Sequence, residues 1–382
     1  MVKLVLLSSN LFDTFGGYEK IILTLFQNLA QKKFEFTIIS VAYTKKLLSN
    51  KILDEFKNYN IHRFSPYKNN FVRRLSIILS KISFRDFLID NGMLKEYFKK
   101  LNFNPDLILV TDPFLVLSAR NAVESLNLNT KIVYWDHAQL INFLKYGKTR
   151  FLLRKEITKA LNSADAFLAI STGIRNIILS YNPNAKVFTV FNPISKYEGK
   201  LVRRPNNPIF LYVGRIEDHQ KNISFMLKGL SKIKNKWKLI IIGEGPDKNK
   251  LINLAKKLKI EDKIEWKGFK KDPYENLEEV TALLLTSRWE GLPTVLIEAI
   301  QRGIPVISSN CSTGPEDIVI SGVNGYLYED GNLNEFVSLM EKIINGKLKF
   351  GTPEEIAKTA EKFDADIVIA NIKNAIKTIV SN

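Results

Sequence analysis

The chain has 382 residues, 45% of them hydrophobic and 25% charged, so it is long enough to bury two sizeable cores. Its single cysteine, Cys311, excludes an internal disulfide and a cysteine-rich metal site, and we expect it to be a small buried residue after a strand. The formal net charge of +17 is concentrated in residues 1–200, which hold 29 Lys and Arg but only 15 Asp and Glu. A half this basic could face nucleic acid, an anionic membrane or an anionic substrate.

Short apolar, β-branched runs alternate with helical patterns along the chain. In the first half the predicted strands are 4–7, 36–41, 107–110, 131–135, 166–170 and 187–191, with helical periodicity between them, as at 17–31 and 172–181. The second half restarts the alternation with predicted strands at 209–213, 239–242, 264–266, 282–285 and 306–308. This alternation predicts an α/β fold with two parallel, doubly wound sheets, each Rossmann-like.

A polar stretch separates the two series. Residues 192–208 contain three prolines and a glycine without an apolar period, which is typical of a linker. We therefore predict one Rossmann-like domain over 1–195 and a second over 205–365. Residues 366–382 have the pattern of an amphipathic helix, which we expect to pack back on the first domain.

The apolar run at the start of the chain is too short for a signal peptide and is better explained as a buried first strand. No run of 18 apolar residues occurs, so we expect no segment that spans a bilayer. These observations favour a cytoplasmic protein, attached peripherally to the inner face of the plasma membrane if its basic half docks there.

In open parallel sheets, ligands bind beyond the carboxyl ends of the strands, so the residues after each strand are the candidates for chemistry. After the first strand, Gly16 and Gly17 precede a helical pattern, where paired glycines would let the backbone approach a phosphate or a sugar. A tight turn explains these glycines equally well. Neither the dinucleotide fingerprint GxGxxG nor a P-loop occurs in the chain.

Two cations follow the first strand of the second half. Gly214 permits a close approach of the backbone, while Arg215 and Lys221 provide positive charges that suit a diphosphate. Two basic residues in a loop are more often solvated surface, but their position after a strand favours the functional interpretation. Gly243 begins a second glycine-containing turn, 243–246, between an apolar strand and a helix.

The strongest pattern follows the strand at 282–285. Glu290 and Gly291 precede Leu292 and Pro293, which suits the first turn of a helix, and Glu298 lies about two helical turns further on. The helix N-terminus would direct N–H groups at an anion, and two carboxylates could accept hydrogen bonds from sugar hydroxyls. By itself, a spacing of eight residues between two glutamates is common and carries little weight.

Together these residues resemble family 4 retaining glycosyltransferases, which have the GT-B fold of two Rossmann-like domains facing across a cleft. Arg215 with Lys221, the turn at 243–246, and Glu290 with Glu298 occur in the family's order, and the two glutamates are similar to its E-x7-E motif. Residues 210–328 also resemble bacterial lipopolysaccharide 1,6-galactosyltransferases, through segments 280–287 and 311–317. The first half is similar only loosely, at the Gly16–Gly17 turn, 135–137 and 169–171.

The resemblance implies roles in the second half of the chain. Arg215 and Lys221 would hold the diphosphate and stabilise charge on the leaving group. Glu290 would contact the donor sugar, with help from the backbone of Gly291 and Leu292, and Glu298 would bind the ribose hydroxyls.

In the first half, the resemblance implies that His137 reaches the donor sugar from across the cleft, and that Gly16 and Gly17 line the cleft near the phosphates. Without the resemblance, a histidine after a strand is more often structural.

The resemblance further implies transfer of a hexose, galactose or glucose, from a UDP-sugar to a glycan or a lipid-linked saccharide in bacterial cell-surface polysaccharide synthesis. No cofactor or metal is expected, because the three histidines are far apart in sequence and the Asp364-Ala-Asp366 motif fits helix capping better than metal binding. Two alternatives stay open: a GT-B sugar-nucleotide epimerase and a basic nucleic-acid-binding protein. We expect no nucleic-acid partner, because no zinc-finger spacing or RNP motif occurs.

The basic half contains one segment with a specific alternative. In 71–85, apolar residues recur at helical spacing, and Arg73, Arg74, Lys81 and Arg85 occupy other positions of the same pattern. A core-packed helix with a solvated basic face explains the segment most simply. The functional alternative is an interfacial helix that docks on anionic lipid beside the acceptor.

Overall fold

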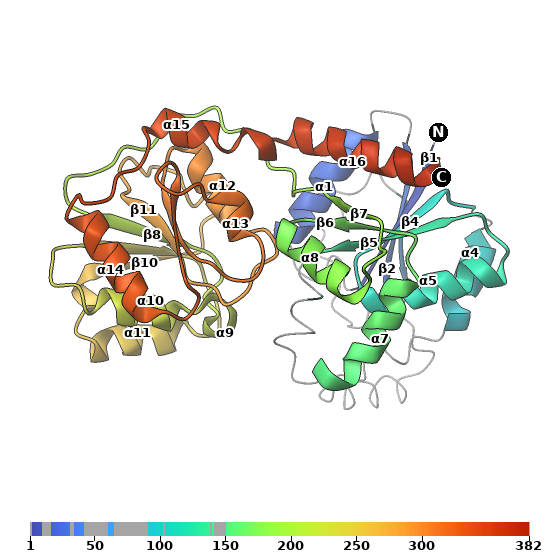
Figure 1. Cartoon of the computed structure of the whole chain (residues 1–382), viewed down its shortest axis with the longest axis horizontal. Coiled ribbons are helices and arrows are strands. Elements are labelled where there is room, and N and C mark those ends of the chain that lie inside the picture. Colours follow the sequence, from blue (N-terminus) through green and yellow to red (C-terminus); the bar gives the residue numbers. More distant parts are fainter. Residues whose placement is uncertain are drawn as a thin grey trace. The chain divides into compact units, whose positions relative to one another are not determined.

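A computed structural model describes residues 2–9, 17–30, 34–41, 60–64, 91–101, 104–137, 140 and 150–381 (Figure 1). The chain divides into two compact units, the first formed by Met1–Pro193 with Ala365–Asn382 and the second by Ile194–Asp364. None of the helices within the described ranges is both long enough and apolar enough to cross a membrane.

The first unit contains a parallel sheet in the order β3-β2-β1-β4-β5-β6-β7. The side chains of its central strands are almost entirely apolar and buried, as expected when helices cover both faces of a parallel sheet. The strands are β1 (Val2–Ser9), β2 (Phe34–Val41), β3 (Asn60–Phe64), β4 (Leu107–Val110), β5 (Lys131–Asp136), β6 (Ala166–Ala169) and β7 (Val187–Thr189).

The helices of this unit connect its strands. Because crossovers between parallel strands are right-handed and the strand order reverses between β1 and β4, α1 and α5 lie on opposite faces of the sheet. The described helices are α1 (Gly17–Ala30), α4 (Asn91–Leu101), α5 (Pro113–Ser125), α7 (Arg150–Asn162) and α8 (Thr172–Tyr181), together with α16 (Ala365–Val380) from the end of the chain.

The last helix of the chain belongs to the first unit. In Figure 1, α16 (red) lies beside α1 (blue), and the Nζ of Lys373 donates a hydrogen bond to the carbonyl of Asn28 at 3.4 Å. Its buried residues, such as Ile372 and Ile376, recur at helical spacing. The end of the chain therefore returns to the unit in which the chain begins.

The second unit repeats the same topology, with a parallel sheet in the order β10-β9-β8-β11-β12-β13. Its strands are β8 (Ile209–Val213), β9 (Lys238–Ile242), β10 (Ile264–Gly268), β11 (Ala282–Leu285), β12 (Val306–Ser309) and β13 (Gly325–Tyr328). Its α-helices are α9 (Asp218–Lys221), α10 (Ile223–Leu230), α11 (Lys248–Lys257), α12 (Thr294–Gln301), α13 (Pro315–Ile318), α14 (Leu333–Ile344) and α15 (Pro353–Lys358).

All eleven strands predicted from the sequence are confirmed, but β3 and β13 were missed. Both missed strands lie at an edge of their sheet. An edge strand can be covered less completely than a central one, which shortens its apolar run; in β13 the two middle residues are only half-buried, whereas the edge strands β7 and β10 were predicted. The helices predicted at 17–31 and 172–181 correspond to α1 and α8, whereas segment 71–85 lies outside the described residues.

The predicted linker, 192–208, is attached to the second unit. Ile194 forms a bridge with Asp364, Arg203 forms one with Glu279, and the N–H of Val202 donates to the carbonyl of Arg302 at 2.9 Å. The second unit consequently begins at Ile194 rather than at 205. Proline content indicated an irregular segment, but backbone pairing determines which unit it joins.

Candidate active site

The strand order of the second unit reverses between β8 and β11, which lie side by side at the centre of the sheet. In doubly wound sheets, such a switch point opens a crevice beyond the carboxyl ends of the two strands. The loop after β8 contains Arg215 and Lys221, and the loop after β11 contains Glu290. The sheet therefore brings together three predicted site residues that are up to 75 positions apart in sequence.

The loop after β8 is held by bonds to its own backbone. The hydroxyl of Tyr212 donates to the carbonyl of Arg215 at 2.9 Å, and the carboxylate of Asp218 accepts the N–H of Ser224 at 2.7 Å. Asn222 separates the short helix α9 from α10 with a φ of 52°, a left-handed conformation that asparagine tolerates. These bonds fix the path of the loop and the point from which the side chain of Lys221 leaves it.

The glycines of the first two loops are in direct contact. A Cβ on Gly243 would lie 1.9 Å from the carbonyl oxygen of Gly214, so no larger residue fits at 243 without moving the backbone. Beyond them, the N–H of Ile216 donates to the carbonyl of Glu244 at 2.9 Å. The loops after β8 and β9 thus form one continuous backbone surface.

Lys221 and Glu290 form an ion pair across the switch point. The Nζ of Lys221 lies 2.7 Å from Oε1 of Glu290, and the side chains are 18% and 8% exposed. The hydroxyl of Thr286 donates toward the carbonyl groups of Lys221 and Asn222 at 3.0 and 3.1 Å, which joins the two loops again. The ammonium group has three donors, so two are left for a phosphate oxygen while the pair persists.

Arg215 is the more accessible of the two cations. Its side chain is 63% exposed, and its guanidinium contacts the carboxylate of Glu217 on the same loop. An exposed ion pair is worth little, so the carboxylate of Glu217 can be displaced by a ligand with greater charge. The sequence analysis missed Glu217; an acidic residue two positions from a candidate phosphate-binding arginine was its only signal.

Residues that follow β12 support the loop from Glu290 to α12. The hydroxyl of Thr313 donates to the carbonyl of Glu290, and Gly314, with a φ of 94°, is close enough that a Cβ would lie 2.7 Å from the carbonyl of Gly291. The sequence analysis assigned no site role to Thr313 or Gly314. Their signal was a Ser-Thr-Gly-Pro turn, 312–315, a few residues after a predicted strand.

Pro293 immediately precedes α12 rather than occupying its first turn, and its carbonyl accepts the N–H of Leu296 at 2.9 Å. No side chain caps α12, so the N–H groups of Thr294 and Val295 at its start are open to an anion or to a sugar hydroxyl. Gly291, Leu292 and Pro293 together form the approach to this helix end.

Glu298 lies in the second turn of α12 and is half-buried. Its carboxylate is one of the charges that raise the pKa of Tyr274, after the larger effect of burial, so the two side chains are neighbours. Its backbone carbonyl accepts a 2.8 Å hydrogen bond from Nη1 of Arg302. Glu298 thus lies on the helix that follows the loop of Glu290, eight residues further along the chain.

The predicted residues of the first unit are only partly described. Gly16 lies outside the described residues, and Gly17 is the first residue of α1. His137 follows β5, with its ring 4.3 Å from that of Trp135. Burial lowers the pKa of His137 to about 3, so its imidazole is neutral at physiological pH.

Two further observations concern possible metal ligands and the single cysteine. No group of three or more His, Cys, Asp or Glu side chains that could hold a metal ion occurs in the part of the chain that the structure describes. Cys311 is buried, as predicted, and burial together with the charge of Glu290 raises the pKa of its thiol to about 12.

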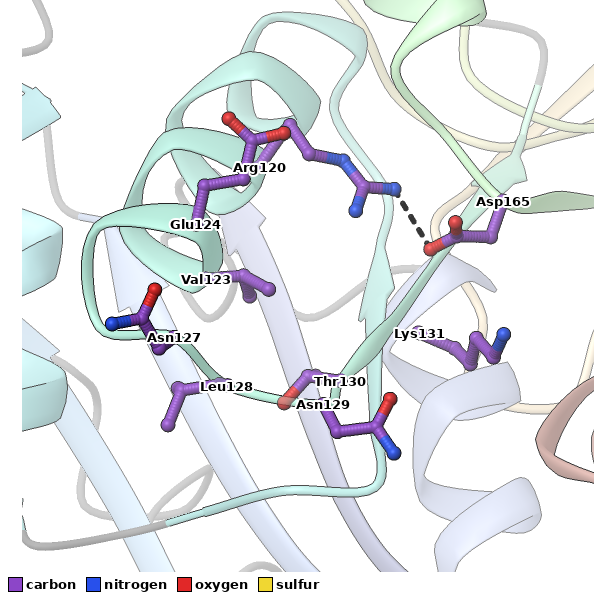
Figure 2. Close-up of a pocket in the computed structure, with 9 residues that line it drawn as sticks. All are labelled: Arg120, Val123, Glu124, Asn127, Leu128, Asn129, Thr130, Lys131 and Asp165. Carbon is purple, nitrogen blue, oxygen red and sulfur yellow. Dashed lines mark ion pairs between the residues drawn. The ribbon is translucent and has the colours of Figure 1, made fainter.

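A hollow of about 530 Å³ lies in the first unit, beside the end of α5 and the starts of β5 and β6. Figure 2 shows the side chains that line it. Arg120 crosses it to form a 2.8 Å ion pair with Asp165, which also accepts the N–H of Ile132 at 2.6 Å. This hollow lies at the amino ends of the strands. It is thus separate from the carboxyl edge, where the candidate residues gather.

The fold and the switch-point residues define a GT-B glycosyltransferase. The solved lipopolysaccharide outer core galactosyltransferase WaaB, in its apo form, superposes with a TM-score of 0.82 at 28% identity over 99% of each chain. HepE from Anabaena, solved with UDP-glucose, has the same fold, with a TM-score of 0.70 at 16% identity over 99% of this chain and 100% of its own.

Sequence comparison agrees with the fold. The family model described as glycosyltransferase family 4 matches residues 15–196, and the model described as glycosyl transferases group 1 matches residues 194–363. The lipopolysaccharide 1,6-galactosyltransferase of Salmonella typhimurium is 33% identical over 282 residues, which cover 72% of this chain and 75% of that protein. The chain belongs to the family 4 glycosyltransferases.

Proposed function

We propose that this glycosyltransferase moves a hexose, galactose or glucose, from a UDP-sugar to a glycan or lipid-linked saccharide, with retention of anomeric configuration and without a metal ion. The proposal assigns the enzyme to the synthesis of a bacterial cell-surface polysaccharide. It is supported by the names of the relatives, which are galactosyltransferases of lipopolysaccharide, and by the solved complex of HepE with UDP-glucose.

The single observation that carries the proposal is the Lys221–Glu290 ion pair at the switch point. A cation that faces a phosphate and a carboxylate that faces a sugar must lie side by side if the bond between phosphate and sugar is to break there. The exposed guanidinium of Arg215 and the uncapped first turn of α12 add positive potential at the same edge of the sheet.

The difficult step is heterolysis of the anomeric C–O bond, which produces an oxocarbenium-like sugar and leaves negative charge on the diphosphate. Arg215 and Lys221 stabilise that developing charge more than they stabilise the ground state, and this difference lowers the barrier. Because none of the described residues is assigned as a nucleophile, we infer that retention follows from attack by an acceptor hydroxyl on the face that the diphosphate leaves, with the hydroxyl proton passing to the departing phosphate oxygen. Glu290 holds the hydroxyls of the reacting sugar, and Glu298 holds the ribose.

His137 acts in this proposal as a neutral group at the donor sugar. With a pKa of about 3 it carries no charge near neutral pH, so it can exchange hydrogen bonds with a hydroxyl but cannot stabilise the departing phosphate electrostatically. The charge of the leaving group is accordingly assigned to Arg215, Lys221 and the start of α12, and not to His137.

The test is a panel of nucleotide sugars, each assayed for slow donor hydrolysis and for transfer to saccharide acceptors. We expect UDP-galactose or UDP-glucose to be used and the product to keep the donor's anomeric configuration by NMR. Arg215→Ala should reduce turnover strongly, whereas Arg203→Ala, which removes an arginine of similar exposure (65%) paired with Glu279, should not. Conversion of the donor into an epimeric UDP-sugar without an acceptor would instead identify an epimerase.

A further inference from the structure

Helix α12 is tethered by two side chains that have no assigned role in the reaction. The hydroxyl of Tyr274 donates a 3.0 Å hydrogen bond to the carbonyl of Val295, in the first turn of the helix. At the other end, Arg302 is the C-cap residue of the helix itself, and its Nη1 donates a 2.8 Å hydrogen bond back to the carbonyl of Glu298. The first bond ties the start of the helix to Tyr274, and the second holds the Arg302 side chain along the turn that carries Glu298.

The two tethering side chains also hold each other. The guanidinium carbon of Arg302 lies 4.3 Å from the centroid of the Tyr274 ring and 4.2 Å from that of Tyr197, so the cation lies against two aromatic rings. Its Nε is buried without a hydrogen-bond partner among the described residues. Contact with the ring faces, together with the bond to Glu298, therefore fixes the arginine.

Tyr274 is 6% exposed, and its backbone is fixed as well, because its N–H donates to the carboxylate of Asp272 at 2.9 Å. Burial raises the pKa of its hydroxyl, and the nearby charge of Glu298 raises it further. The hydroxyl therefore stays protonated and remains a hydrogen-bond donor. The aromatic and guanidinium groups of Tyr274, Arg302 and Tyr197 are called the α12 clamp below.

The orientation of α12 decides where the Glu298 carboxylate lies. With side chains a helix is about 10–12 Å wide, so a rotation of about 10° moves a group at its surface by about 1 Å. An error of that size weakens a directional hydrogen bond substantially. Because α12 has only eight residues and no side-chain cap, its own backbone bonds do little to prevent such a rotation.

We propose that Tyr274 and Arg302 are positioning residues that set the enzyme's preference for a ribonucleotide, by holding Glu298 in place for the two ribose hydroxyls. The inference rests on the proposed function, in which Glu298 binds the ribose. It adds that the selectivity for ribose depends on the α12 clamp as well as on the carboxylate.

The experiment compares the binding of UDP, 2′-deoxy-UDP and 3′-deoxy-UDP by calorimetry. Tyr274→Phe keeps the ring but removes the bond to Val295. We expect it to weaken UDP binding by about three- to tenfold and the binding of each deoxy analogue by less, because each analogue keeps only one of the two ribose hydroxyls. A variant that was only destabilised would have fewer folded binding sites, and this would affect all three ligands equally. A change in the ratio of the affinities for UDP and for the deoxy analogues therefore reports a change in the position of Glu298. Tyr326→Phe, which removes a 2.7 Å bond to the carbonyl of Lys349 on another part of the unit, is the matched control and should keep the wild-type ratio.

Two further variants make every outcome informative. Arg302→Lys keeps the charge but loses the planar group between the rings, and should lower the preference for UDP as Tyr274→Phe does. Tyr274→Phe should add nothing in a Glu298→Gln background. If Glu298→Gln abolishes the preference while Tyr274→Phe and Arg302→Lys keep it, the inference is wrong and the proposed function stands. If Glu298→Gln itself keeps the preference, the ribose assignment fails, and the positioning role fails with it.

Discussion

The Nζ of Lys221 lies 2.7 Å from Oε1 of Glu290, and this ion pair joins the loop after β8 to the loop after β11 across the switch point of the second sheet. The Glu290 side chain is only 8% exposed, so water stabilises its negative charge less than that of a surface carboxylate, and the lysine must stabilise it instead. The pair is thus both a structural link and the place where phosphate and sugar are proposed to separate.

We predict that Lys221→Met destabilises the protein by about 1–3 kcal/mol, because it leaves a mostly buried carboxylate without its cation. The double variant Lys221→Met with Glu290→Gln should lose less than the sum of the two single changes. Urea unfolding measures each value. Lys248→Met, which breaks a pair of the same length with the half-exposed Glu244, should cost less than about 1 kcal/mol. Equal costs for the two lysines would contradict the importance of burial.

A second prediction concerns acid stability. The folded pKa of His137, about 3, lies below its unfolded value of about 6.5, so protonation favours the unfolded chain. The stability contributed by neutral His137 is complete above pH 6.5 and is lost as the pH falls toward 3. Between pH 7 and 5.5 the wild type should lose about 1 kcal/mol relative to His137→Asn, as measured by urea unfolding at both values. A constant difference between the two proteins would show that the histidine titrates normally.

We also predict that excess EDTA leaves the transfer rate nearly unchanged, because two cationic side chains and the start of α12 supply positive charge at the diphosphate. The rate should be measured before and after chelation, and again after Mg²⁺ or Mn²⁺ is restored. A strict requirement for either ion would contradict the roles proposed for Arg215 and Lys221.

The basic segment 71–85 supports a prediction from sequence alone, since it lies outside the described residues. Charge reversal at Arg73, Arg74 and Lys81 should weaken salt-sensitive binding to anionic vesicles and leave UDP affinity unchanged. Reversal at Lys234, Lys236 and Lys238, three exposed lysines before β9 and within it, changes the net charge equally and should have little effect. If the wild type does not float together with anionic vesicles at low salt, the docking hypothesis is wrong.

Local sequence patterns predicted the sheets because central strands are continuous apolar runs, and they failed only at two of the four edge strands, β3 and β13. They also placed Arg215, Lys221, Glu290 and Glu298 after strands or on the helix that follows, where a parallel sheet presents its ligands. The Lys221–Glu290 pair was not predictable, because its members are 69 residues apart and meet only when β8 and β11 become neighbours. The same applies to Tyr274, whose contact with Val295 joins segments on either side of β11.

The most discriminating prediction separates the two glutamates of the E-x7-E pair. Glu298, if it binds ribose, holds a part of the donor that does not react, so Glu298→Gln should weaken UDP and UDP-sugar alike, by about 1.5–3 kcal/mol. Glu290, if it binds the reacting sugar, should matter most as the glycosidic bond breaks. Glu290→Gln should therefore lower kcat by about 100-fold or more, with UDP affinity near wild type.

The glutamine at 290 can still accept a hydrogen bond from Lys221, which limits the structural damage, and circular dichroism must show both variants folded. Calorimetry with UDP and steady-state transfer then give the two quantities for each variant. Full kcat in folded Glu290→Gln would remove the catalytic role of the loop after β11. An equal loss of UDP affinity in both variants would instead refute the division of roles, because then both carboxylates would serve the ground state of the nucleotide rather than the transition state of the sugar.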